Sequence, residues 1–310
     1  MQRLGGFVRF TLLCVAATPL MAQTQIGGGT CSSSTLNGAY AFSLTGRQVS
    51  SSGNFTAVFQ GNGTASFDGL SKVTITLTAS TVGAAGTPLN WSGTYSVQSN
   101  CVGVMNITSG GSATLNIALY DTGADFLVTG NDAVYGYSGT GNNQPSGCAA
   151  ATLAGVYTFN GTGFGLSGGA VNGITDGGGL LQFDGQSKLT VNVTISASGK
   201  GPLPLTLTGS YAISSNCVGS ANLTDSNANA YTMSFSVYTA SALASTDLYA
   251  TLAESARFLI SGGAHAIYGQ PTATSASAAL DPASETFGGS RAAFNATPAA
   301  NKSATGERGE

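Results

Sequence analysis

Few residues in this chain could carry out acid–base or metal chemistry. The 310 residues include a single histidine, His265, and no glutamate before Glu254. A zinc site needs several His, Cys or carboxylate ligands, and a serine hydrolase triad needs a histidine. Neither can be assembled in the first half of the chain, so we predict no catalytic residue, no metal site and no cofactor.

His265 is the one residue for which an acid–base role can be considered. It aligns with Asp132 of an earlier, related segment, just before a Tyr-Gly pair that both segments share. A histidine at the mouth of a barrel could act as an acid or base, whereas a loop histidine at the end of a strand has no chemical role. We favour the second interpretation and keep His265 only as a weak candidate for ligand binding.

Aromatic side chains are the other candidates for a binding site. Tyrosine and phenylalanine two residues apart on a strand lie on the same face, where they could line an apolar cavity or fill a core. A filled core is the simpler interpretation. The candidates are Tyr40, Phe42, Tyr95, Tyr157, Phe159 and Tyr211.

These aromatic residues belong to an internal repeat. The stretch GNGTASFDGLSKVTITLTAS…GTYSVQSNCVGVMNIT at 61–108 returns without a gap as GGGLLQFDGQSKLTVNVTIS…GSYAISSNCVGSANLT at 177–224. Upstream, CSSSTLNGAYAF at 31–42 recurs as CAAATLAGVYTF at 148–159. We therefore predict two tandem copies of one domain.

Each copy has the pattern of an antiparallel β domain. Short alternating segments rich in β-branched and aromatic residues are separated by Gly, Asn, Asp and Ser. Such strands form a barrel of about eight strands or, alternatively, a β-sandwich, with one face of each strand in the core and the other in water. The expected strands of the first copy are 38–45, 54–60, 63–67, 71–80, 90–98, 101–108, 113–120 and 125–136.

Turn residues recur at equivalent places in both copies. Asp68-Gly69 and Asp184-Gly185 are typical of tight hairpins in which a central residue has positive φ. The glycine-rich segments 61–63 and 177–179 are not followed by a helix, as a phosphate-binding loop would require, so we expect a bulge or bend there.

Four cysteines remain if an export signal is removed. Residues 1–22 have the charged start, apolar centre and small-residue cleavage site of a signal peptide. The other cysteines are Cys31, Cys101, Cys148 and Cys217, and only pairing within each copy gives both domains the same bridge. We therefore expect disulfides Cys31–Cys101 and Cys148–Cys217 and a secreted or periplasmic location, with no transmembrane segment in the mature chain.

The remaining segments complete the expected domain organisation. We place repeat 1 at 31–137, a linker at 138–147, repeat 2 at 148–269 and a disordered tail at 270–310. Residues 239–257 look like an insertion that forms a short helix, a loop or a lid. Charged residues make up only 7% of the chain and the net charge is -3, so a nucleic-acid partner is not expected.

The combination of LNGAYAF, FDGLSK and GTYSVQSNCVG resembles exported β-rich proteins of the Acidobacteria group. The resemblance covers both repeats but implies no assigned activity. The opening Leu-x-Gly-x-Tyr is also similar to the start of lipocalin-like barrels.

These observations favour a non-catalytic cell-envelope or extracellular protein with a binding or structural role. A lipocalin-like carrier of a small apolar ligand is one alternative. An isomerase or cyclase of the allene-oxide-cyclase or dirigent kind is another, and it needs a cavity with a buried Asp or Tyr of displaced pKa. Adhesion to an extracellular polysaccharide would require an exposed row of aromatic residues.

Overall fold

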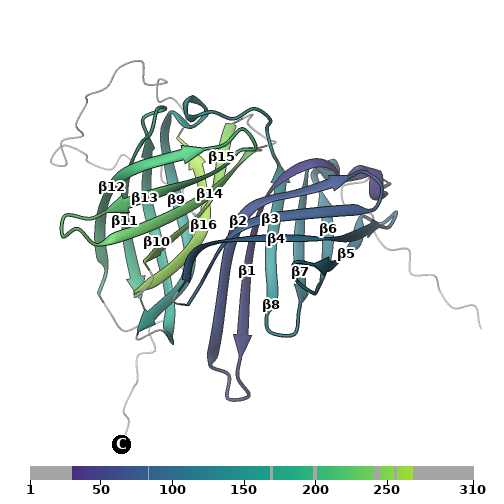
Figure 1. Cartoon of the computed structure of the whole chain (residues 1–310), viewed down its shortest axis with the longest axis horizontal. Helices are drawn as coiled ribbons and strands as arrows, with labels where there is room; N and C mark the ends of the chain where they lie inside the picture. The colour runs from purple at the N-terminus through teal and green to yellow at the C-terminus, as the bar shows by residue number, and fades with distance from the viewer. Residues whose placement is uncertain are drawn as a thin grey trace, which may run out of the picture. The chain divides into compact units, whose positions relative to one another are not determined.

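The computed structural model describes residues 30–82, 84–167, 170–197, 201–240, 245–254 and 257–267. The expected signal peptide and C-terminal tail lie outside these ranges. Within them the chain forms two closed antiparallel β-barrels (Figure 1), which confirms the expected fold class and excludes the sandwich alternative. No helix among the described residues is long and apolar enough to cross a bilayer.

Barrel 1 contains eight strands in sequence order, and the last pairs with the first. A short 3-10 helix, η2 (Ser33–Thr35), precedes them, and η3 (Asp121–Gly123) joins two of them. The strands are β1 (Asn37–Val49), β2 (Phe55–Asp68), β3 (Lys72–Thr81), β4 (Ala84–Val97), β5 (Val102–Ser109), β6 (Ala113–Tyr120), β7 (Asp125–Asn131) and β8 (Gly136–Asn143).

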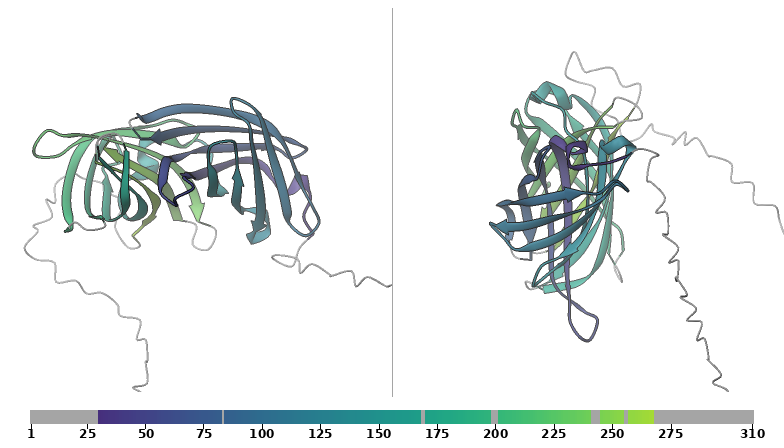
Figure 2. Two further views of the ribbon diagram at one scale, coloured as in Figure 1. Left: turned by 90° about the horizontal axis from the view of Figure 1, so that it is seen from below. Right: turned by 90° about the vertical axis from the view of Figure 1, so that its right-hand side faces the viewer.

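Barrel 2 repeats this topology, and β16 closes onto β9. The 3-10 helix η4 (Ala150–Leu153) takes the place of η2. The strands, seen from two further directions in Figure 2, are β9 (Gly155–Ser167), β10 (Ala170–Phe183), β11 (Lys188–Ala197), β12 (Leu203–Ile213), β13 (Val218–Thr224), β14 (Ala230–Ala240), β15 (Ser245–Glu254) and β16 (Phe258–Ala266).

The Asp-Gly turns form as expected. Gly69 and Gly185 have φ of +73° and +76°, values that glycine adopts without strain. The Asp68 carboxylate accepts hydrogen bonds from the backbone N–H groups of residues 70, 71 and 72 at 2.8 to 2.9 Å. The Asp184 carboxylate accepts the same three bonds in the second copy, so these acids fix the turn.

Both predicted disulfides are present, and each ties a 3-10 segment to the start of a strand. Cys31 pairs with Cys101, with Cα atoms 4.9 Å apart, and Cys148 pairs with Cys217 at 5.1 Å. At this end of each barrel, a disulfide therefore holds the 3-10 segment against the fifth strand.

Three details of the sequence interpretation were wrong. The glycine-rich segments make no bulge or bend, since residues 61–63 continue β2 in unbroken register and join two expected strands into one. Gly63 lies so close to β3 that a Cβ atom would come within 2.0 Å of the Thr76 carbonyl oxygen. Residues 138–143 belong to β8 and complete barrel 1, so only residues after Asn143 connect the barrels.

The third correction concerns residues 239–257. Most of this segment is not an inserted helix or lid but β15, which pairs with β14 and β16 and is equivalent to β7. Tyr238 lies opposite Asp247 as Tyr120 lies opposite Asp125. The equivalence is hidden in the sequence because the aligned Phe258-Leu259 belongs to the last strand.

In most strands one face is buried and the other is exposed to solvent, but β2 is an exception. Residues 58–65 of β2 are all buried, because one face fills barrel 1 and the other packs against barrel 2 within the same compact unit. Val58 of β2 packs with Phe164, Leu166 and Leu259 of barrel 2. Alternation predicts only the barrel core, so it could not reveal this second contact.

Candidate functional site: the open end of barrel 2

The aromatic candidates of barrel 1 lie in a packed interior. Tyr40, Phe42 and Tyr95 are at most 4% exposed. Tyr40 meets Phe67 and Phe126 edge to face at centroid separations of 5.5 and 5.4 Å. The Tyr95 hydroxyl donates to the carbonyl oxygens of Ser33 and Leu36 at 2.8 and 2.9 Å, so it anchors η2 over the barrel end.

The candidates of barrel 2 have the same environment. Tyr157, Phe159 and Tyr211 are at most 4% exposed and belong to one core cluster. Phe183 lies edge to face with Tyr157 and Tyr211 at 5.5 and 4.9 Å. Burial and the charge of Asp247 raise the pKa of Tyr157 to about 12. These rings contact one another and fill the interior.

His265 lies on β16 and not at a loop. Its side chain is 63% exposed, and Nδ1 lies 2.8 Å from the Asp247 carboxylate, which is largely buried. The position is equivalent to Asn142 of β8, because His265 pairs with Thr158 and Asn142 pairs with Ala41, which are equivalent residues of β9 and β1. The alignment with Asp132 was therefore wrong. Among the described residues no group of three His, Cys, Asp or Glu could hold a metal ion.

The two barrels differ most at the end away from the disulfide. In barrel 1 this end is closed by an aromatic plug of Phe59, Trp91, Tyr135 and Tyr137. Phe59 stacks on Trp91 at 6.4 Å, and Tyr137 meets both rings at 5.9 and 6.0 Å. The Tyr137 hydroxyl also donates to Asp132 at 2.5 Å, which fixes the ring.

Barrel 2 has no such plug. By strand register, the equivalents of Phe59, Trp91 and Tyr137 are Thr175, Leu207 and Ile260. Three large rings are thus replaced by smaller side chains. Barrel 2 gains one ring in exchange, because the buried Tyr231 takes the place of Ala113 and lies 6.1 Å from the Phe258 ring.

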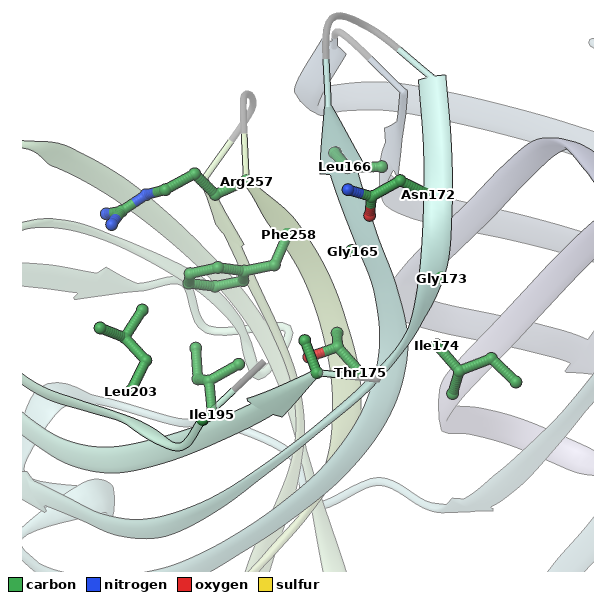
Figure 3. A pocket seen from close by; sticks show the side chains of 12 residues that line it. Gly165, Leu166, Asn172, Gly173, Ile174, Thr175, Ile195, Leu203, Arg257 and Phe258 are labelled. Atoms are coloured by element: carbon green, nitrogen blue, oxygen red, sulfur yellow. The ribbon is translucent and has the colours of Figure 1, made fainter. Parts of the chain in front are cut away.

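A pocket of about 180 Å³ lies at this end of barrel 2. Its apolar lining is supplied mainly by Leu166, Ile195, Leu203 and Phe258, and glycines 165 and 173 also line it. Figure 3 shows the Phe258 ring near Leu203 and Ile195, with Thr175 on the other side. The Thr175 hydroxyl donates to the Ser196 carbonyl oxygen at 2.8 Å, so its one hydrogen is already used.

The charge at the rim is already paired. Arg257 Nε donates to Glu254 at 2.8 Å, and the guanidinium also bonds the Tyr231 hydroxyl and lies 5.6 Å from that ring's centroid. Partial burial alone would lower the pKa of Arg257, but the hydrogen bond to Glu254 and the nearby groups raise it. In Figure 3 the guanidinium points away from Thr175 and Leu166, so Arg257 offers the pocket mainly its aliphatic stem.

Sequence reasoning missed this pocket, although the signal was present. The notable difference Trp91 against Leu207 marks where one copy is filled and the other is not. The difference at Phe59 was also readable, because extending the ungapped repeat two residues upstream places Phe59 against Thr175. The difference at Tyr137 could be read only from strand register, because the last two strands of the copies do not align by sequence.

No protein-family model and no curated protein matches the chain. Among the solved structures that match the chain, two have low identity and low TM-scores. The isotype 1 transferrin-binding protein B from serogroup B Neisseria meningitidis is 8% identical with a TM-score of 0.23, and the match covers 74% of this chain and 76% of that one. A protein of unknown function from the DUF3598 family of Nostoc punctiforme is 9% identical with a TM-score of 0.21, covering 75% and 97%. Neither likeness says what this chain binds.

Proposed function

We propose that this chain is an exported, non-catalytic binding protein whose second barrel takes a small, neutral, apolar group at its open end. The observation that supports this proposal is the difference between the copies: the same end is plugged by Phe59, Trp91 and Tyr137 in barrel 1 and left as a pocket in barrel 2. The two disulfides fit an oxidising compartment, and the N-terminal sequence fits export.

The chemistry of the lining favours a neutral ligand. The residues that line the pocket include no carboxylate, and the one cation, Arg257, is paired with Glu254. A charged ligand would lose hydration without gaining an opposite charge. An apolar group would bury against Ile195, Leu203 and Phe258, and the volume is in the range that holds one benzene-sized ring.

The alternatives receive less support from the described residues. The large apolar residues that are exposed there are aliphatic, so the aromatic row that would favour a polysaccharide is missing from these ranges. An isomerase or cyclase would place a buried acid in the cavity, whereas the buried Asp247 pairs with His265 away from the pocket lining.

Three probes of similar size and different charge test the proposal. Benzyl alcohol, benzoate and benzylammonium are titrated into the mature protein while methyl NMR signals of Ile195 and Leu203 are followed. We expect benzyl alcohol to shift these signals at concentrations roughly tenfold below those needed for either ion. Equal binding of an ion would refute the neutral-ligand claim, and the absence of any shift would refute the site itself.

A further inference from the structure

A second unassigned site lies where β2 of barrel 1 packs against barrel 2. The face of β2 that points out of barrel 1 carries Gln60, Asn62 and Thr64, and all three are buried, at 1%, 0% and 8% exposure. Exposed strand positions normally carry such polar residues. Here they are enclosed between two barrels, so each polar atom needs a hydrogen-bond partner.

Asn62 is the centre of this polar seam, which we define as Gln60, Asn62, Ser234, Ser236 and Thr251. The Asn62 amide nitrogen donates to the Ser234 carbonyl oxygen and to the Thr251 hydroxyl at 3.0 and 2.9 Å. The Gln60 amide nitrogen donates to the Thr162 carbonyl oxygen at 3.0 Å. The donors of both amides are thus satisfied across the two barrels.

The acceptors of the same amides are not satisfied. Gln60 Oε1 and Asn62 Oδ1 are buried without a hydrogen-bond partner, and so is the hydroxyl of Ser236. Gln60 and Asn62 are two residues apart on one face of β2, and Ser236 is two residues from Ser234, whose hydroxyl lies 3.2 Å from the Asn62 nitrogen. Three orphaned polar atoms therefore lie on the facing sides of β2 and β14.

We propose that the polar seam binds ordered water at the orphaned atoms Gln60 Oε1, Asn62 Oδ1 and Ser236 Oγ. A buried water typically makes about three hydrogen bonds to groups that would otherwise lack partners. Water can donate to both amide oxygens and pair with the hydroxyl. A monovalent cation could also contact these oxygens, but the seam residues are all neutral, and a buried cation without a counter-charge is costly. Water is therefore the ligand that fits.

Replacing Ser236 by alanine tests this proposal with the loss of one atom. The equivalent residue of the first copy is Ala118, so the change introduces a side chain that the fold already uses there. A dry, orphaned hydroxyl costs stability, so its removal would stabilise the protein. A hydroxyl that holds water is satisfied, so Ser236→Ala should increase the unfolding equilibrium constant several-fold in urea titrations. Ser220→Ala, on the exposed face of the neighbouring β13, is the matched control and should change little.

A direct readout accompanies the stability measurement. In rotating-frame NOE spectra of the intact protein, the Asn62 side-chain amide should show a cross peak to long-lived water that weakens in Ser236→Ala. Stabilisation by Ser236→Ala together with no such cross peak would overturn the proposal. Stability that depends on sodium or potassium, compared with tetramethylammonium at equal ionic strength, would show that a cation occupies the seam instead.

Discussion

Phe59 and Thr175 occupy the same register position in the two barrels. Each lies on the second strand of its copy, opposite a glycine of the strand before it, Gly46 or Gly163. Phe59 fills the end of barrel 1 with Trp91 and Tyr137, whereas Thr175 borders a pocket. This position is one of three, with Trp91/Leu207 and Tyr137/Ile260, at which a ring in barrel 1 is replaced by a smaller side chain beside the pocket of barrel 2.

Restoring the ring at this position should remove binding. In Thr175→Phe we expect the phenyl ring to occupy the pocket, so benzyl alcohol should bind roughly tenfold more weakly or not at all. Thr194→Phe places the same ring on the exposed face of β11 and should leave binding unchanged. Methyl NMR titration measures both, and undiminished binding by Thr175→Phe would place the ligand elsewhere.

The reverse change should open barrel 1. Trp91→Leu introduces the residue of the second copy and removes a ring that stacks on Phe59, which should lower the free energy of unfolding by about 2–4 kcal/mol. Adding Phe59→Thr should create benzyl alcohol binding in barrel 1. Urea denaturation followed by circular dichroism gives the stability. Leu127→Ala, at a side chain that is 54% exposed, should lower the free energy of unfolding far less. An equal loss would mean that Trp91 contributes no more to stability than an exposed side chain.

The equivalent tyrosines Tyr95 and Tyr211 should give the protein an alkaline limit. Burial raises the pKa of each to about 12, with a further contribution from the nearby Asp68 or Asp184. Because the folded pKa lies above the unfolded value of about 10, their contribution to stability is complete below pH 10 and is lost as the pH rises towards 12. Absorbance of tyrosinate should show this late titration in the folded protein.

The variant Tyr95→Phe removes both the hydrogen bonds and the titrating hydroxyl, whose effects on stability are measured at different pH. It removes the bonds to Ser33 and Leu36, which should cost about 0.5–1.5 kcal/mol at neutral pH, and it should reduce the loss of stability above pH 10. An alkaline profile identical to that of the unaltered protein would contradict the assignment.

Asp225 should be the most acidic of the turn carboxylates. Hydrogen bonds from the Asn229 side chain and backbone, together with the Tyr231 hydroxyl, lower its pKa to about 2. Its contribution to stability is therefore present above pH 4 and is lost as the pH falls through 2. The carboxyl carbon shift measured by NMR should give this midpoint, and Asn229→Ala should raise it towards the ordinary value. A midpoint near 4 in both proteins would show that the turn does not hold the carboxylate.

Much of the fold could be predicted from the sequence because both copies repeat the same local patterns. Alternation identified most of the strands, although it divided β2 and missed β8 and β15. Asp-Gly identified the turns at Asp68 and Asp184, and equal spacing identified the disulfides. These features depend on neighbours in sequence, so a single chain reveals them.

The pocket and the seam depend on contacts that local patterns do not encode. Thr175 marks a pocket only once Ile260 is known to take the place of Tyr137, and this equivalence comes from the barrel register. In the sequence Asn62 has the position of an exposed strand residue. Alternation shows that its side chain points out of barrel 1, but it does not show whether that face contacts solvent or a second barrel. The six aromatic candidates were recognised as shared residues, but their sequence did not say whether they enclose a cavity.

The account is tested most directly by a crystal structure of the mature protein soaked in benzyl alcohol. We predict electron density for one ring between Ile195, Leu203 and Phe258 at the open end of barrel 2, with none at the plugged end of barrel 1. An empty pocket at a concentration that saturates the NMR titration, or a ring bound elsewhere in the molecule, would contradict the proposed binding site.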